Sequence, residues 1–263
     1  MNESKENETS IPFTARLMAY YRAQESKKDN PLFKDPFAEK LAGDLTSYFE
    51  NDQSFAVNDY PLIRSYYIDK YLLTPWCKKH DKSQIAILGS GFDTRAYRFS
   101  PLKSGNHFIY EIDFQEIHHY KEDILTNEKA LCQLKRIPTD LSNTNWISHL
   151  INEGFSSKVP TFWILEGLTY YIEREIIISL INNIAKISIN KSEIFADTCD
   201  PVCAEVDFGP YFRHFKWGLI KEEVVPFFNQ LGWEVSCINA DDYDQGRFVG
   251  NGLMMFNYGK KKE

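Results

Sequence analysis

The stretch Ile85-Ala86-Ile87-Leu88-Gly89-Ser90-Gly91 decides the fold. Four apolar residues are followed at once by two glycines, a pattern typical of a buried strand that turns sharply into a loop. Outward from it, four more apolar runs indicate strands, at residues 107–112, 132–138, 161–165 and 193–196. Helix-like stretches separate them, at residues 114–129, 145–152 and 174–187. Strands that alternate with helices at this spacing predict right-handed βαβ units and a parallel sheet covered on both faces.

The two ends of the chain differ from this central part. After a helix expected at residues 221–231, the apolar stretches 233–237 and 252–258 predict an antiparallel pair at the sheet edge. The first third of the chain is expected to be helical, with helices at residues 14–26 (capped by Thr14), 36–48 and 61–73. We therefore expect one α/β domain, which consists of a flexible tail (1–13), a helical cap (14–80) and a Rossmann-like core (81–263).

Composition limits the possible functions. The 263 residues suffice for one sizeable core, and 43% hydrophobic and 25% charged residues are typical of a soluble globular protein. A net charge of −7 argues against nucleic acid as a partner, because a nucleic-acid surface needs a basic face. The polar N-terminus lacks a signal-peptide core, and no apolar run approaches the length of a membrane span. We expect no membrane partner.

Cysteines and histidines give no indication of a metal. The five cysteines are scattered and form no Cys-x-x-Cys pair, which indicates reduced thiols in a cytoplasmic protein. His118 and His119 are adjacent, so on a helix their side chains diverge and predict helix surface.

Four expected strands end in polar residues that could bind a ligand. In an open parallel sheet, ligands bind beyond the carboxyl ends of the strands. Gly89 and Gly91 let backbone N–H groups approach a ligand closely. Thr94 stands where the dinucleotide fingerprint has its third glycine, which disfavours a nicotinamide cofactor.

The next strand ends supply carboxylates. An acidic group after the second strand can accept hydrogen bonds from both hydroxyls of a ribose, and Asp113 follows Gly89 by 24 residues, near the roughly 20 expected. Glu111 shares the same strand face, so one of the two acids binds and the other is structural; Asp113, nearer the strand end, is our choice. Asp140 could accept a hydrogen bond from the amino group of an adenine, and the adjacent Leu141 could make an apolar contact with the ring.

These motifs together resemble the leucine carboxyl methyltransferase family, including its bacterial branch of polyketide-type O-methyltransferases. The resemblance covers roughly residues 14–175, and its most distinctive segments are Pro31-Leu32-Phe33-Lys34-Asp35-Pro36 and Gly91-Phe92-Asp93-Thr94-Arg95. It implies the class I methyltransferase fold, a Rossmann-like, mostly parallel sheet with a C-terminal antiparallel hairpin, and S-adenosyl-L-methionine as the cofactor.

The resemblance also implies a role for individual residues. Arg64 and Arg22 would bind the methionine carboxylate from the helical N-terminal segment, and Glu166 would face the methionine amino group. Elementary chemistry agrees, since an amino-acid zwitterion needs one cation and one anion, and arginine binds carboxylates bidentately. The complete predicted cofactor site consists of Arg22, Arg64, Gly89, Gly91, Asp113, Asp140, Leu141 and Glu166.

The methyl acceptor is less defined by the sequence. Tyr170 and Tyr171 follow Glu166, and Arg213 and His214 lie after the fifth strand, where members of this family place substrate-facing loops. A carboxylate acceptor needs no base, and Arg213 would hold it; an alcohol acceptor needs one, and His214 would deprotonate it. The four residues are candidates, and aromatic packing with two surface charges is an equal alternative.

The sequence thus predicts a cytoplasmic O-methyltransferase that acts on a hydroxyl or carboxyl group of a small metabolite. The alternatives are a protein C-terminal carboxyl methyltransferase, a nicotinamide-dependent oxidoreductase and a non-catalytic module that binds S-adenosylmethionine. The oligomeric state is left open.

Overall fold

The computed structural model describes residues 12–45, 59–206, 213–247, 249 and 252–263. Within these residues, seven strands form one sheet with the order β3-β2-β1-β4-β5-β7-β6. The strands β1 to β5 run parallel to one another, whereas β7 is antiparallel to both β5 and β6. Their bounds are β1 Lys82–Leu88, β2 Asn106–Asp113, β3 Gln133–Pro138, β4 Thr161–Leu165, β5 Glu193–Cys199, β6 Trp233–Asn239 and β7 Met254–Lys261. The predicted parallel sheet with a C-terminal antiparallel pair is confirmed.

The strand order reverses beside β1. The chain builds β1, β2 and β3 outward in one direction and then returns to place β4 on the other side of β1. The loops after β1 and β4 therefore leave the sheet in opposite directions and open a crevice between them, which is where ligands bind in sheets of this kind.

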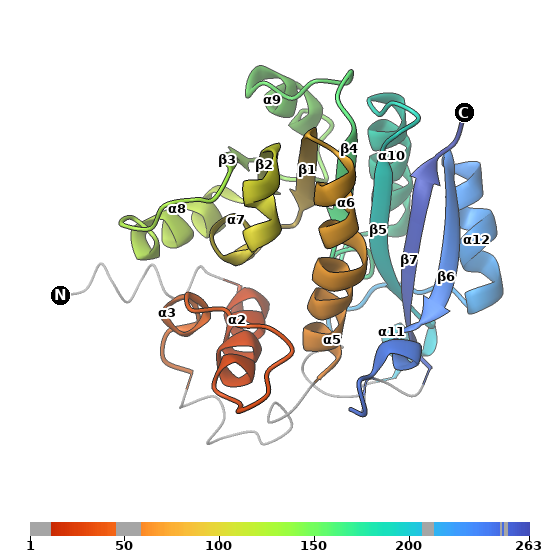
Figure 1. Ribbon diagram of the computed structural model, residues 1–263. Coiled ribbons are helices and arrows are strands. Elements are labelled where there is room, and N and C mark those ends of the chain that lie inside the picture. The colour runs from red at the N-terminus through yellow and green to blue at the C-terminus, as the bar shows by residue number, and fades with distance from the viewer. Residues whose placement is uncertain (1–11, 46–58, 207–212, 248, 250–251) are drawn as a thin grey trace.

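Helices cover both faces of the sheet (Figure 1). Residues of β1 alternate between two apolar clusters, with Ile85 and Ile87 in one and Ala86 and Leu88 in the other. The first cluster is completed by a long helical segment, α5 (Tyr60–Tyr67), η2 (Ile68–Leu73) and α6 (Thr74–Lys79). The second is completed by α9 (Trp146–Asn152), α10 (Arg174–Lys186) and α12 (Lys221–Gln230). The short helices are α7 Arg95–Arg98, η3 Ser100–Ser104, α11 Val202–Glu205 and η4 Ala240–Tyr243.

Two helices lie beyond the carboxyl ends of the strands, α2 (Phe13–Ser26) and α3 (Ala38–Ala42), and Figure 1 shows them below the sheet. Ala19 and Leu41 pack with Phe92 and with Ile117 of α8 (Gln115–Ile124), which fixes both helices to the core. The buried side chain of Arg16 donates to the carbonyls of Ala42 (2.9 Å) and Asp44 (2.9 Å), and so satisfies acceptors at the end of α3.

A buried ion pair joins α2 to the other end of the chain. The carboxylate of Glu25, which is fully buried, accepts hydrogen bonds from Nη1 (2.8 Å) and Nη2 (3.0 Å) of Arg247. Burial alone would raise the pKa of Glu25, but Arg247 and Lys28 lower it to about 2. The carboxylate is therefore charged at neutral pH and holds α2 against the segment between β6 and β7.

The structure divides the predicted cap of residues 14–80. Of its described residues, α2 and α3 lie over the strand ends, whereas residues 60–79 pack on the sheet because Ile63, Tyr67 and Trp76 belong to the central core. The predicted tail overlaps the first helix, since Pro12 is its N-cap and Phe13 its first residue; residues 1–11 lie outside the described residues. Thr14 lies inside the helix and makes no capping hydrogen bond, so the prediction that Thr14 is the N-cap residue is wrong.

Other boundaries differ more modestly. The helix expected at 36–48 spans only Ala38–Ala42, because Gly43 leaves helical geometry with φ +62° and ψ −162°; residues 46–48 lie outside the described part. The helix expected at 114–129 ends at Ile124, and β5 continues beyond the predicted residue 196 to Cys199. Among the described residues, no helix has the length and apolar character that crossing a membrane requires.

Candidate functional site

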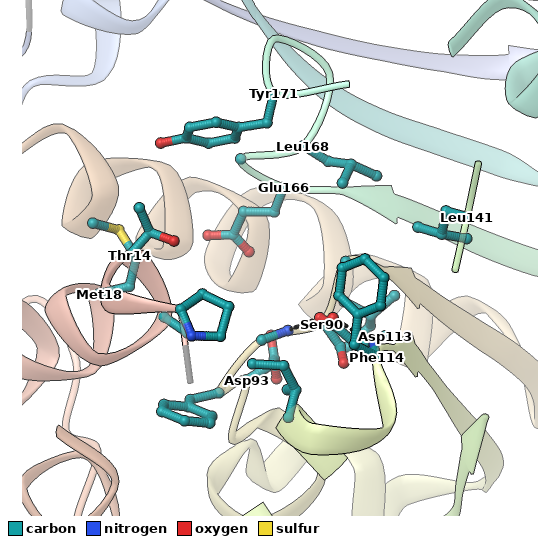
Figure 2. A pocket seen from close by; sticks show the side chains of 18 of the residues that line it. Thr14, Met18, Ser90, Asp93, Asp113, Phe114, Leu141, Glu166, Leu168 and Tyr171 are labelled. Atoms are coloured by element: carbon teal, nitrogen blue, oxygen red, sulfur yellow. Dashed lines mark hydrogen bonds between the residues drawn. The ribbon is translucent and has the colours of Figure 1, made fainter. Parts of the chain in front are cut away.

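One cavity of about 660 Å³ opens at the carboxyl ends of the strands. Its walls come from α2, α5, the loops after β1, β2, β3 and β4, and the segment before α12. Figure 2 shows Thr14, Met18 and Tyr171 on one side of it, Asp113, Phe114 and Leu141 on the other, and Glu166 between them. All eight predicted cofactor residues line the cavity: Arg22, Arg64, Gly89, Gly91, Asp113, Asp140, Leu141 and Glu166.

The loop after β1 depends on its glycines. Gly89 and Gly91 have φ values of +65° and +47°, which side chains rarely adopt. A Cβ on Gly89 would stand 2.7 Å from Cδ1 of Leu168, so the loop after β4 packs directly on this backbone. The Gly91 N–H donates to Oδ2 of Asp113 at 2.7 Å, which couples this loop to the end of β2.

Asp113 is the acid of β2 that reaches the cavity. Burial raises its pKa, against the opposing effect of hydrogen bonds from the Gly91 and Phe114 N–H groups. Glu111, the alternative, does not line the cavity; it is fully buried and pairs with Lys121 (2.8 Å) and Arg136 (3.1 Å).

Arg64 and Glu166 form the charged centre of the cavity. Arg64 donates from Nε to Glu166 (3.2 Å) and from Nη1 to Asp197 (2.6 Å). Its Nη2 has no hydrogen-bond partner among the described residues. Burial opposes ionisation of Glu166, yet Arg95 and Arg64 lower its pKa to about 2. A fixed guanidinium edge thus lies beside a permanent carboxylate, the arrangement that an amino-acid zwitterion requires.

Arg22 is placed differently from Arg64. Its Nε pairs with Asp35 at 2.8 Å and its Nη2 donates to the carbonyl of Phe92 at 2.6 Å. The pKa of Asp35 lies below its usual value because Arg22 and Arg98 outweigh the effect of burial. Although Arg22 lines the cavity, its Nε is held by Asp35 and its Nη2 ties α2 to the loop after β1.

Several residues of the site were not assigned from the sequence. Arg95, almost fully buried, pairs with Asp69 (2.5 Å), with Asp93 and with Glu166 (2.8 Å). Asp197 of β5 accepts from Arg64 and from two tyrosines. A carboxylate inside the apolar run Glu193–Cys199 was a usable signal for Asp197, since buried acids need partners. Arg95 follows the glycine loop but looks like a surface charge in sequence.

The candidates for the acceptor side separate into two pairs. Tyr171 and His214 line the cavity. Tyr170 does not; it is buried, donates its hydroxyl to Asp197 at 2.9 Å and stacks on Phe215. Arg213 is exposed and also does not line the cavity. The expectation that Tyr170 and Arg213 face the acceptor therefore has no support in this geometry.

His118 was expected on the helix surface, and this is wrong. Its side chain is 2% exposed and its Nε2 lies 3.3 Å from the carbonyl oxygen of Ile137. Burial and the neighbouring Lys121 lower the pKa of His118 to about 4, so the ring is neutral at pH 7. His119 is exposed, as expected.

Two solved structures share this fold over nearly the whole chain. A protein of the DUF574 family from Streptomyces avermitilis matches with a TM-score of 0.64 and 11% identity, over 98% of this chain and 100% of that one. A structure titled as a "putative methyltransferase" from Thermobifida fusca matches with a TM-score of 0.57 and 16% identity, over 98% of both chains. The chain has the fold of the class I S-adenosylmethionine-dependent methyltransferases.

The sequence narrows this class to a family. Residues 15–185 match the leucine carboxyl methyltransferase family. A relative from Mycobacterium ulcerans, named "Putative S-adenosyl-L-methionine-dependent methyltransferase", is 31% identical over 185 residues, which are 62% of this chain and 58% of that protein. The chain thus spans little more than half the length of this relative. The chain belongs to the leucine carboxyl methyltransferase family, whose methyl donor is S-adenosylmethionine.

The cavity suits this cofactor by its own chemistry. The free Nη2 edge of Arg64 and the ionised Glu166 match the carboxylate and ammonium of the methionine part. Gly89 presents bare backbone to the cavity, and Asp113 and Asp140 lie at the ends of the next two strands. The sheet order, with β7 inserted antiparallel beside β5, also departs from the dinucleotide-binding order, which disfavours the nicotinamide alternative.

Proposed function

We propose that the protein transfers a methyl group from S-adenosylmethionine to the hydroxyl oxygen of a small metabolite. The observation that carries this proposal is that one cavity has two chemically different ends. One end holds the charged residues and glycines that follow the strands. The other is lined mainly by apolar and aromatic residues of α2 and of the segment after β4: Phe13, Leu17, Met18, Tyr171, Ile172 and Ile176.

The donor end would hold the cofactor as follows. Arg64 binds the methionine carboxylate through Nη2, and Glu166 accepts from the ammonium group. Asp113 accepts from the ribose hydroxyls, while Asp140 and Leu141 contact the adenine. When bound, S-adenosylmethionine would supply a methyl group whose carbon a nucleophile can attack, because the positively charged sulfur that carries it is a good leaving group. The protein positions the two reactants, and positioning can supply much of the rate of such a displacement.

The charges around the cavity favour a neutral acceptor. Of the arginines that line it, Arg22, Arg64, Arg95 and Arg98 each pair with at least one carboxylate. Lys216 pairs with Glu173 at 2.9 Å. Apart from Nη2 of Arg64, which the proposal assigns to the methionine carboxylate, an acceptor carboxylate would have to share a described lining arginine or lysine with a protein carboxylate, and a buried anion with incomplete pairing is costly. A hydroxyl group carries no such cost.

A hydroxyl acceptor needs a base, and His214 is the described cavity residue that suits this role. Histidine side chains exchange protons in the neutral range, and His214 lines the same cavity as Tyr171 and Lys216. His214→Gln should reduce kcat for a hydroxyl substrate on the order of 10²–10⁴-fold. Arg213→Gln is the matched control, because Arg213 is adjacent and exposed but lies outside the cavity lining; it should keep full activity.

The experiment uses pairs of small aromatic and aliphatic compounds that share a skeleton and differ only in a hydroxyl or a carboxyl group. Turnover is followed by release of S-adenosylhomocysteine and by the mass of the product. We expect methyl ethers from the hydroxyl members. Methyl esters from the acids, or a His214→Gln enzyme with full activity on a hydroxyl substrate, would contradict the proposal.

Calorimetry separates the remaining alternatives. Binding of NAD but not of S-adenosylmethionine would indicate an oxidoreductase. Binding of S-adenosylmethionine without turnover would indicate a non-catalytic module, and turnover of a C-terminal peptide but of no metabolite would indicate a protein methyltransferase. A cytoplasmic location is part of the proposal and is supported by the five free thiols.

A further inference from the structure

Asp197 is a buried acid that the proposed reaction does not use directly. It lies in β5 opposite Phe256 of β7, within a strand whose seven residues are all buried. Its own side chain is fully buried. An ionised carboxylate in such a place requires strong compensation from donors.

Four donors surround this carboxylate. Oδ2 accepts from Nη1 of Arg64 (2.6 Å), from the hydroxyl of Tyr60 (2.6 Å) and from the hydroxyl of Tyr170 (2.9 Å). Oδ1 accepts from the N–H of Gly167 at 2.7 Å. Tyr60 and Arg64 belong to α5, and Gly167 and Tyr170 to the loop after β4, so Asp197 fixes both segments to β5.

The guanidinium of Arg64 is held in one orientation as a result. Nη1 bonds to Asp197 and to the hydroxyl of Tyr170 (3.0 Å), Nε bonds to Glu166, and the guanidinium carbon lies 5.2 Å from the centre of the Tyr60 ring. A Cβ on Gly167 would lie 2.9 Å from Nη2. The guanidinium therefore rests against bare backbone, with Nη2 as its remaining donor edge.

We propose that Asp197 is a positioning residue that orients Arg64 toward the methionine carboxylate of the cofactor. This inference rests on the proposed role of Arg64. Without the Asp197 charge, Arg64 keeps Glu166 as its acidic partner and turns toward it, away from the ligand carboxylate. Removal of the Asp197 charge should therefore weaken binding of the amino-acid end of the cofactor and leave binding of the adenosine end unchanged.

Two ligands distinguish these ends. S-adenosylhomocysteine carries the amino-acid group, whereas 5′-methylthioadenosine has the same thioether and adenosine without it. For Asp197→Asn we expect the Kd for S-adenosylhomocysteine to rise about 10- to 150-fold, as for a lost hydrogen bond to a charged group. The Kd for 5′-methylthioadenosine should change by less than about twofold. Both are measured by calorimetry on the full chain, with circular dichroism to check folding.

Glu193→Gln is the matched control. Glu193 lies on the same strand and is also buried and paired, with Lys79 (3.0 Å) and Tyr258 (2.7 Å), but neither of these partners lines the cavity, whereas Arg64, the partner of Asp197, does. It should change neither Kd. Equal weakening of both ligands by Asp197→Asn, or no weakening of either, overturns the positioning role.

A second variant covers failure of Asp197→Asn to fold. Tyr170→Phe removes one donor from Asp197 and one acceptor from Arg64, so it should weaken S-adenosylhomocysteine about 2- to 10-fold and spare 5′-methylthioadenosine. If the ratio of the Kd for S-adenosylhomocysteine to the Kd for 5′-methylthioadenosine is unchanged in this variant, the inference is also overturned. Failure of the wild-type protein to bind either ligand would instead contradict the proposed function itself.

Discussion

Asp113 is the residue on which cofactor binding should depend most simply. Its carboxylate lines the cavity and accepts from the Gly91 N–H. Asp113→Ala should weaken S-adenosylmethionine by about 1.5–3 kcal/mol, the range for a hydrogen bond to a charged group. Calorimetry gives the dissociation constant, and Asp123→Ala, which removes an exposed acid from α8, is the control. An unchanged constant in the folded Asp113 variant would remove the ribose role from this residue.

Gly167 provides a second prediction at this scale. An added methyl group would meet Arg64, and the φ of +67° is strained for any side chain. Gly167→Ala should cost stability of the order of 1 kcal/mol from strain and should also weaken S-adenosylmethionine at least tenfold by displacing Arg64. Gly154→Ala separates the two effects, because Gly154 also has positive φ but nothing within 4 Å of the added carbon. Thermal denaturation and calorimetry together check both variants. Normal binding by Gly167→Ala would show that Arg64 tolerates displacement.

At the scale of elements, α2 forms one wall of the cavity through Thr14, Met18 and Arg22. A variant without residues 1–10 keeps α2 complete and should bind S-adenosylmethionine normally. A variant without residues 1–30 loses this wall and should lose binding by at least two orders of magnitude, as measured by calorimetry. Circular dichroism shows whether the sheet remains folded. Normal binding by the longer deletion would exclude α2 from the site.

The attachment of α2 should depend on pH through Glu25. Its pKa of about 2 is depressed relative to an ordinary glutamate near 4.3, so its contribution to stability is complete above the ordinary value and is lost as the pH falls toward 2. Glu25→Gln should lower Tm at pH 7 by roughly 3–10 °C, given about 1.5–3 kcal/mol for charged hydrogen bonds in a chain of this size. Denaturation scans between pH 7 and pH 2 test this. The acid-induced drop in Tm should be shallower in the variant; parallel curves would refute the assignment.

The elements were largely predictable, and the ion pairs were not. A short apolar run predicts each strand of the parallel part, and the helices between the strands are long enough for the helical spacing of their apolar residues to be recognised. The end of α3 at Gly43 was missed because apolar and polar residues continue in helical order beyond it. Arg64 and Glu166 could be assigned only through family resemblance. The partners Arg95 and Asp197 reach them across 71 and 133 residues of sequence, a proximity that only the packed sheet creates.

At the scale of the whole molecule, the position of β7 decides whether the sheet can be completed. β7 lies between β5 and β6 and is the neighbour of both, although it follows both in the sequence. A chain that ends before Met254 should therefore leave β6 without a partner and should not bind S-adenosylhomocysteine. Solubility and calorimetry check this expectation; retained binding would show that the parallel strands suffice.

The buried ion pair between Glu25 and Arg247 also affects when the protein can fold during synthesis. The ribosome makes α2 before β1 to β7, yet Arg247, which pairs with Glu25 of this helix, is synthesised 222 residues after it, and β7 emerges after that. At some 5–20 residues per second, Glu25 of α2 waits many seconds for this partner. The sheet and this ion pair are thus incomplete until Arg247 and Met254–Lys261 have been synthesised. A message truncated before the codons of Met254–Lys261 would yield an aggregation-prone open sheet edge rather than a slow enzyme.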